Sequence, residues 1–157
     1  MWDEIREVLE NGSEEEKELF RLTLQAVRQK RERQSAYPSG FMGLSGRFVA
    51  PDVYEFRVSV TPYLLNRGGV VHGGMTALLA DSTMGSLINR SLPDDQFAVT
   101  SEMKIHYLSP GRSKELISRA TLLDLRHPFA VASCTVTDER ERKIAYATGT
   151  FFIGTRR

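Results

Sequence analysis

Residues 66–81 have the sequence Asn66-Arg67-Gly68-Gly69-Val70-Val71-His72-Gly73-Gly74-Met75-Thr76-Ala77-Leu78-Leu79-Ala80-Asp81. A glycine-rich turn here runs directly into a segment rich in small and apolar residues, which predicts a helix over residues 74–90. Because apolar side chains occupy most sides of this helix, we expect it to be largely buried in the core.

Strand patterns lie on both sides of the predicted helix. Residues 46–60 are typical of a hairpin around Ala50-Pro51-Asp52, and four strand-like segments follow the helix, at about 97–108, 114–125, 129–138 and 143–153. One helix followed by four consecutive strands favours an α+β fold over alternating βαβ units. The simplest packing is an antiparallel sheet wrapped around the helix at 74–90.

The N-terminal part of the chain has a helical pattern. Apolar residues recur at helical spacing over residues 2–10, and Asn11-Gly12 supplies a stop. Ser13-Glu14-Glu15-Glu16 has the form of a capping box and opens a second helix that runs to about Gln34. Its basic end, residues 28–33, is either solvated or binds phosphate. Tyr37-Pro38-Ser39-Gly40 interrupts the pattern, so we expect a helical extension over residues 1–35 and one domain over residues 42–157.

The bulk composition argues against several classes of protein. The chain has 157 residues, 21 Lys and Arg against 20 Asp and Glu, a net charge of +1 and a single cysteine, Cys134. This charge balance argues against nucleic-acid binding, no apolar run approaches the roughly 20 residues that cross a bilayer, and the first residues lack the features of a secretory signal. One cysteine and three scattered histidines provide neither a disulfide nor a metal-ligand spacing. We therefore expect a cytoplasmic protein without a membrane segment, a nucleic-acid partner or a metal.

His72-Gly73-Gly74 lies at the N-terminus of the predicted helix. Backbone N–H groups at such an end have no partner within the helix, and the helix dipole favours negative charge there. Glycine also lets another molecule approach the backbone closely. The segment therefore binds a phosphate or polarises a carbonyl whose oxygen becomes negative during attack, or it is a tight turn without a ligand.

Asp81 is the second unusual feature, because a carboxylate in the middle of an apolar helix is costly to bury. No Lys or Arg lies within four residues of it, so no local ion pair accounts for it. Two explanations stay open. Either Asp81 is exposed or bonded to Ser82 or Thr83, or it is held in a cleft as a base or nucleophile.

Asn66, His72-Gly73-Gly74 and Asp81, followed by a strand-rich half, resemble the hotdog-fold thioesterases of the phenylacetate-degradation (PaaI) type. The resemblance covers about residues 42–154 and includes Ala147-Thr148-Gly149-Thr150-Phe151 in the last predicted strand. It implies a hotdog fold and the hydrolysis of an aryl- or medium-chain acyl-CoA to free acid and CoA, without a cofactor.

The resemblance also implies a role for each matching residue. The Gly73 N–H would polarise the thioester carbonyl, and Asp81 would attack it directly or activate a water. His72 would orient the loop or contact the thioester, and Asn66 would hold the attacking water or the thioester region. In this family the helix end and the acid come from different subunits, which implies a homodimer or a dimer of dimers.

A polar helper is expected early in the strand that follows the helix, and Thr100 matches its place. Simple alternation, however, puts Thr100 on the face opposite to Val99 and Met103 and gives Ser101 the apolar parity. Either the strand is bulged or Ser101 serves instead; we prefer Thr100. Gly85 stands where some relatives carry a hydroxyl one helical turn after the acid.

For the CoA moiety the family uses loops at strand ends. The basic residues of the matching segments, Arg112, Arg126 and His127, would pair with CoA phosphates, although single surface residues of this kind are also explained by solvation. The predicted substrate-binding set is completed by Gly74, Ser109 and Gly111.

Three alternatives stay open. A non-catalytic hotdog module would bind acyl-CoA as a sensor or carrier, which leaves the cost of Asp81 unexplained. A hotdog dehydratase would need an Asp–His pair acting together, whereas His72 lies nine residues before Asp81. A protein whose N-terminal helices mainly bind a partner would lose that binding, but not its fold, on deletion of residues 1–35.

Overall fold

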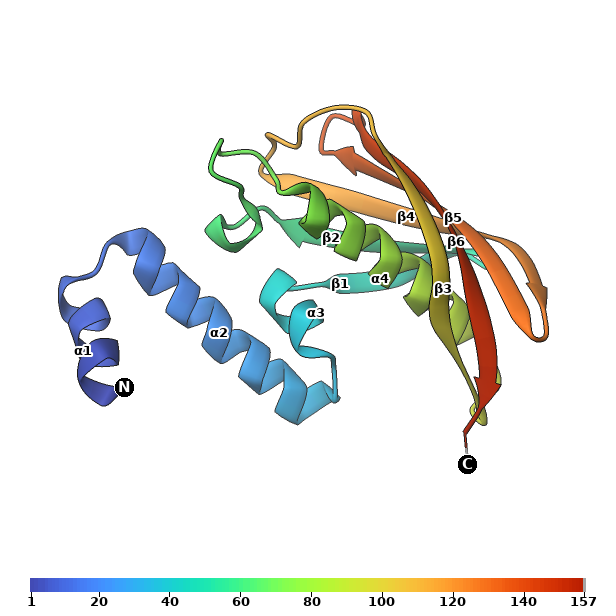
Figure 1. Cartoon of the computed structure of the whole chain (residues 1–157), viewed down its shortest axis with the longest axis horizontal. Helices are drawn as coiled ribbons and strands as arrows, with labels where there is room; N and C mark the ends of the chain where they lie inside the picture. The colour runs from blue at the N-terminus through green and yellow to red at the C-terminus, as the bar shows by residue number, and fades with distance from the viewer. Residues whose placement is uncertain (157) are drawn as a thin grey trace.

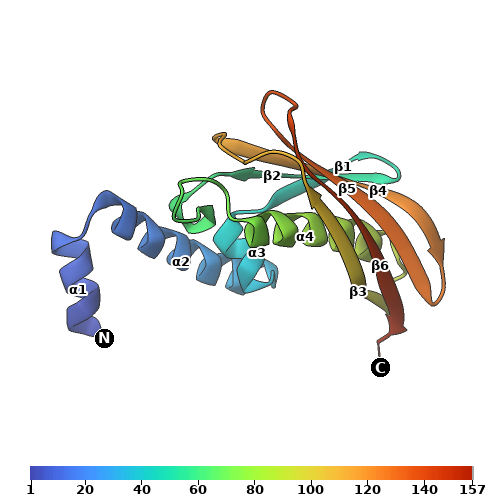
Figure 2. The same cartoon turned by 45° about the horizontal axis from the view of Figure 1, so that its top comes forward.

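The computed structural model describes residues 1–156; residue 157, the last of the predicted domain, lies outside the described part. Within residues 1–156, six antiparallel strands form one sheet in the order β1-β2-β4-β5-β6-β3. Their bounds are β1 Ser45–Ala50, β2 Val53–Ser59, β3 Gln96–Tyr107, β4 Glu115–Arg126, β5 Phe129–Asp138 and β6 Lys143–Thr155. The helix α4, Gly73–Ser91, lies along one face of this curved sheet (Figure 1, Figure 2). The predicted α+β hotdog arrangement, a sheet wrapped around a central helix, is confirmed.

The central helix is buried on one face only. Leu79, Ala80 and Leu87 are fully buried, and α4 packs against β2, β3, β4 and β5. Ser82 and Ser86 lie on the other face and are half-buried. The helix is thus largely buried, as expected, but only the side toward the sheet is fully buried, because the sheet covers that side alone.

A buried polar chain fixes α4 against the sheet. The Thr83 hydroxyl donates to the Leu79 carbonyl at 2.6 Å, so the Ser118 hydroxyl, 2.7 Å away, donates to Thr83. Cys134 Sγ lies 3.1 Å from Ser118 Oγ and completes the chain. Burial raises the pKa of Cys134 to about 12, against which the hydroxyls of Ser118 and Thr83 act weakly. Cys134 is thus a buried core thiol and a poor nucleophile.

A bulge in β3 decides where Thr100 lies. The pairing with β6 shifts between Thr100 and Glu102, so that Ser101 is an extra residue in the strand. Thr100 pairs with Phe151 before the bulge, and Met103 pairs with Gly149 after it; both partners belong to the buried face of β6. Thr100 and Met103 therefore share the face toward α4, and the bulged-strand alternative is confirmed. The expectation from alternation that Val99 shares the face of Met103 is wrong, and Val99 is 51% exposed.

The N-terminal helices form as the sequence predicts, with α1 at Trp2–Asn11 and α2 at Glu14–Arg33. In the capping box, the Glu16 N–H donates to Ser13 Oγ at 3.2 Å and the Ser13 N–H donates to the Glu16 carboxylate at 2.7 Å. The expected interruption at 37–40 is wrong, because a short helix, α3, spans Tyr37–Met42. Pro38 fits its first turn, where a backbone N–H would have no partner. A 3-10 turn, η1, follows β2 at Pro62–Leu64.

The outer face of the sheet holds a buried carboxylate between two arginines. Glu55 is 2% exposed, and its two oxygens accept from the Nε atoms of Arg57 at 2.9 Å and Arg119 at 2.6 Å. Burial raises the pKa of Glu55, but the hydrogen bonds and charges of Arg119 and Arg57 outweigh it, so the pKa is lowered overall. The ionised Glu55 carboxylate, bonded to the two arginines, therefore stabilises the fold at pH values above the ordinary carboxyl pKa of about 4.3. This contribution is lost as the pH falls through the lowered pKa of Glu55.

Glu55→Gln is expected to lower the free energy of unfolding at neutral pH by about 1–3 kcal/mol, because hydrogen bonds to a charged group are lost. In acid, where Glu55 of the wild-type protein is protonated, the two proteins should differ less. Urea unfolding followed by circular dichroism at both pH values measures the difference. Glu139→Gln, at an exposed position, is the control. A loss of the same size at both pH values would show that the charge of Glu55 does not matter.

Candidate active site

Asp81 lies half-buried on the side of α4 that faces β3. The Thr100 hydroxyl donates to Asp81 Oδ1 at 2.7 Å, whereas the Thr83 hydroxyl is used by the Leu79 carbonyl. Within residues 1–156, Asp81 has no Lys or Arg partner, and its Oδ2 accepts no hydrogen bond. The site thus presents a carboxylate that is oriented through one oxygen and free at the other.

Asp81 and Thr100 line a cavity of about 890 Å³. Gly85, one helical turn after Asp81, leaves open space in its wall. A Cβ at Gly85 would lie 3.5 Å from the Phe151 ring, an ordinary contact, so the glycine widens the cavity and does not avoid a clash.

Asn89 is a positioning residue that the sequence analysis missed. Its side-chain Nδ2 donates to the Ala98 carbonyl at 3.1 Å, and its Oδ1 accepts from the Ala98 N–H at 2.9 Å. These bonds tie β3 to α4 two residues before Thr100 and so hold Thr100 beside Asp81. The sequence offered no distinctive signal for this role, because Asn89 is one of several polar residues in the second half of the helix.

The N-terminus of α4 offers one free backbone donor. His72 is the N-cap, and its Nδ1 accepts from the Gly74 N–H at 2.9 Å. The Gly73 N–H has no hydrogen-bond partner among residues 1–156. In this conformation Gly73 is available to a ligand oxygen, whereas the N–H of Gly74 is used by the cap.

Tyr107, at the end of β3, was absent from the predicted site. Its hydroxyl donates to the Gly73 carbonyl at 3.0 Å and holds the helix start in place. A cavity of about 350 Å³ lies here and includes Gly73, Tyr107, Ser109 and Gly111 in its lining. The Val71 N–H donates to the Gly111 carbonyl at 2.9 Å and so ties the loop before α4 to the loop after β3. Three predicted residues, Gly73, Ser109 and Gly111, therefore line the same cavity.

Asn66 shapes the loop before α4, because its Oδ1 accepts from the N–H groups of Gly68 at 2.8 Å and Val70 at 3.4 Å. A third cavity, of about 650 Å³, is lined by Asn66, His72 and Arg112 among others. Three further predicted residues therefore lie near one another beside the helix start.

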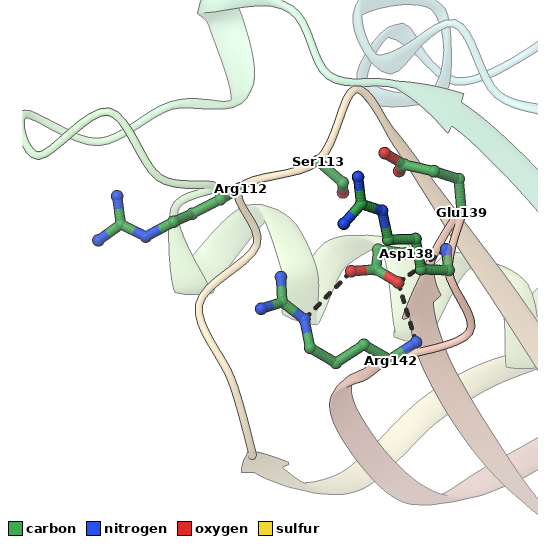
Figure 3. Close-up of a pocket in the computed structure, with 6 residues that line it drawn as sticks. Arg112, Ser113, Asp138, Glu139 and Arg142 are labelled. Atoms are coloured by element: carbon green, nitrogen blue, oxygen red, sulfur yellow. Dashed lines mark hydrogen bonds and ion pairs between the residues drawn. The ribbon is translucent and has the colours of Figure 1, made fainter.

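Arg112 also borders a cavity of about 340 Å³ that is built around Asp138 (Figure 3). Asp138 accepts from the N–H groups of Arg140 at 3.0 Å and Arg142 at 2.9 Å and from Arg142 Nε at 3.1 Å. Burial raises the pKa of Asp138, but these hydrogen bonds and the charge of Arg142 lower it overall. Figure 3 shows Arg112 extending away from this pair, and it forms no ion pair within residues 1–156.

Arg126 and His127 lie at the opposite end of β4 from Arg112. The strand has 12 residues and is therefore about 40 Å long. Arg126 Nη2 is also paired with Asp124 Oδ2 at 2.8 Å. Within one protomer, then, the three basic residues do not form a single phosphate site.

The two halves of the candidate site are likewise apart in one protomer. Gly73 and Asp81 are eight residues apart on α4, which separates them by about 12 Å along the helix axis. They line different cavities, so one thioester group does not reach both within the same chain. Within residues 1–156, no three His, Cys, Asp or Glu side chains gather to hold a metal, and each helix is too short or too polar to cross a bilayer.

A family model described as the thioesterase superfamily matches residues 68–145, the part of the chain that carries Gly73, Asp81 and Thr100. The chain belongs to this superfamily. The PaaI subgroup is a narrower assignment that the match does not make.

Three relatives illustrate the likeness. The BH2602 protein from Bacillus halodurans, crystallised with CoA, is 33% identical with a TM-score of 0.87 over 98% of this chain and 100% of that one. The conserved protein PA5202 from Pseudomonas aeruginosa is 32% identical with a TM-score of 0.71 over 78% of this chain and 99% of that one. The medium/long-chain acyl-CoA thioesterase YigI from Escherichia coli K12 is 28% identical over 98 residues, which are 54% of this chain and 63% of that protein. The chain thus spans less than two thirds of the length of YigI.

Proposed function

We propose that the protein is an acyl-CoA thioesterase that hydrolyses aryl- or medium-chain acyl-CoA to free acid and CoA. The observation that carries the proposal is the Asp81 carboxylate, oriented by Thr100, free at Oδ2 and open to a cavity. The CoA in the B. halodurans structure and the similarity to YigI, a medium/long-chain acyl-CoA thioesterase, support the substrate class. A protein that only binds acyl-CoA gains nothing from a half-buried carboxylate, which argues against the sensor or carrier alternative.

In the proposed reaction, Asp81 takes a proton from a water whose oxygen attacks the thioester carbon, or Asp81 attacks that carbon itself and water then releases the acid. The carbonyl oxygen becomes negative and accepts from the Gly73 N–H. The carbon–sulfur bond then breaks, and the CoA thiolate takes up the proton. Thr100 acts through Asp81, since its hydrogen bond sets the direction of the carboxylate.

The proposed site is shared between two copies of the chain. β3 is an edge strand of the sheet, and edge strands present unpaired backbone groups to a partner. Thr100 lies near the start of β3, and Tyr107, which contacts Gly73, ends it. An antiparallel pairing of two β3 strands would bring the Asp81 half of one copy beside the Gly73 half of the other. We propose this homodimer as the active unit, assembled further as a dimer of dimers.

Within this dimer, we propose that the basic residues near the strand ends bind the CoA phosphates. Arg112 is free of ion pairs within the described part of the chain and lies in the same cavity lining as Asn66 and His72. Arg126 and His127, far from Arg112 in the same protomer, would serve from another subunit.

Thiol release from a panel of aryl- and alkyl-CoA esters tests the proposed function. The buried Cys134 gives little background with a thiol reagent, since its raised pKa keeps it protonated. Turnover of at least one aryl or medium-chain ester is the expected result. Binding of the esters without thiol release would favour the sensor or carrier alternative.

A further inference from the structure

The connection between α2 and α3 borders the cavity that holds Asp81. Gln34, Ala36 and Ser39 line this cavity together with Asp81 and Thr100. Figure 1 and Figure 2 show the end of α2 and the helix α3 on the side of the sheet where α4 lies. Residues 34–39, which join α2 to α3, are therefore part of the candidate site, although they lie outside the region that the family resemblance covers.

This wall of the cavity is firmly packed. A Cβ at Gly40 would lie only 2.7 Å from Ala26 Cα, so α3 touches the backbone of α2 at a residue where no side chain fits. Gln25 Nε2 also donates to the Gly40 carbonyl at 3.3 Å. On the other side of α3, the rings of Phe41 and Tyr63 are stacked with centroids 5.1 Å apart. These contacts join α3 to α2 on one side and to the turn η1 on the other.

The shape of the cavity indicates what this wall does. The reacting carbon of a thioester must lie beside Asp81 and Thr100, so the acyl group extends into the remaining space. Gly85, Ala98 and Phe151 line that space on the core side, and Ala36 lines it from the connection between α2 and α3. The rest of the lining is largely polar and includes Arg90 and Arg156. In one protomer this cavity is open to the surface, and its volume of about 890 Å³ is in the range of pockets that hold a small ligand.

We infer that residues 34–39 form a wall of the acyl pocket and that Ala36 limits the size of the acyl group that the protein accepts. The inference rests on the proposed function, because it assigns the acyl part of the proposed substrate to this cavity. A larger side chain at position 36 should exclude longer acyl chains more strongly than short ones.

Ala36→Phe tests the inference through the affinities of two unreactive thioether analogues, decanoyl-CoA and acetyl-CoA with a methylene in place of the carbonyl. The preference of the protein for the decanoyl over the acetyl analogue, as a ratio of Kd values, should fall at least about tenfold, the effect of losing a few buried methylenes. Ser39→Leu, on α3, should shift the ratio in the same direction and serves if Ala36→Phe does not fold. Ala50→Phe, at the exposed end of β1 and away from the cavity, is the matched control.

An unchanged ratio in both folded variants would overturn the inference, even if both affinities fell together. A wild-type protein that binds both analogues but releases no thiol from acyl-CoA would refute the proposed hydrolysis, while the ratio would still decide whether residues 34–39 wall the pocket. Failure of the wild-type protein to bind either analogue would overturn both proposals.

Discussion

Asp81→Asn is expected to lower kcat for thioester hydrolysis by at least about 100-fold, the scale of a lost positioned acid–base group. Asparagine has the same shape, and its side-chain oxygen still accepts from the Thr100 hydroxyl, which lies 2.7 Å from Asp81 Oδ1. The amide nitrogen, however, neither takes a proton from water nor attacks a carbonyl. Thiol release under saturating acyl-CoA measures the effect.

Two further variants serve as comparisons for Asp81→Asn. Asp52→Asn, in the exposed turn between β1 and β2, removes a carboxylate of the same kind away from the cavity and should leave turnover unchanged. Thr100→Val keeps the shape of Thr100 but removes the bond that orients Asp81, so its loss in kcat should be smaller than that of Asp81→Asn. Full turnover by a folded Asp81→Asn protein would move the chemistry away from this carboxylate.

Gly73→Pro is expected to lower kcat by about 10²–10³-fold, the usual cost of removing one donor to a developing oxyanion. Proline deletes the one backbone N–H that is free at the start of α4 within the described residues. The helix should tolerate the change, because proline is favoured at the first helical position. The preceding residue, His72, already has the extended backbone that proline requires, with φ −61° and ψ 134°. Circular dichroism and thiol release together separate folding from turnover.

Gly73→Ala is the matched control, since alanine keeps the N–H. Its Cβ would lie 3.4 Å from the Tyr107 ring, an ordinary contact, so we expect a smaller loss that reflects crowding of the approaching carbonyl. Equal losses in both variants would mean that crowding, not the missing donor, is responsible. Full activity in both would remove Gly73 from the oxyanion role.

The Asp81→Asn and Gly73→Pro chains can also be combined in one sample. If each site takes Gly73 from one copy and Asp81 from the other, a mixed dimer has one intact site and one site with both changes. When the two chains pair at random, half of the dimers are mixed, and each mixed dimer has one active site of two. Co-expression should therefore restore about a quarter of the wild-type activity. Two inactive chains that stay inactive together would contradict a site shared in this way.

The elements that depend on neighbouring residues were predictable from the sequence. The capping box of Ser13 and Glu16, the helix that starts at the His72-Gly73-Gly74 turn and the places of the strands along the chain follow from local spacing, and all of these are confirmed. The order of the strands in the sheet, in which β3 pairs with β6 and not with β4, was set by the tertiary structure. The candidate residues Gly73 and Asp81 were also recognisable, since a glycine pair at a helix start and a carboxylate in an apolar helix are unusual in themselves.

Only the tertiary structure decided how these pieces meet. Thr100 faces Asp81 because β3 gains a residue at Ser101 as it pairs with β6, and a pairing partner some 50 positions away leaves no mark in the local alternation. Ala36 reaches the cavity of Asp81 because α3 packs on Ala26 through a glycine, a contact between segments whose own patterns are complete without it. Side-chain periodicity reports which face of an element is apolar, whereas the register of one element against another depends on the packing of the whole chain.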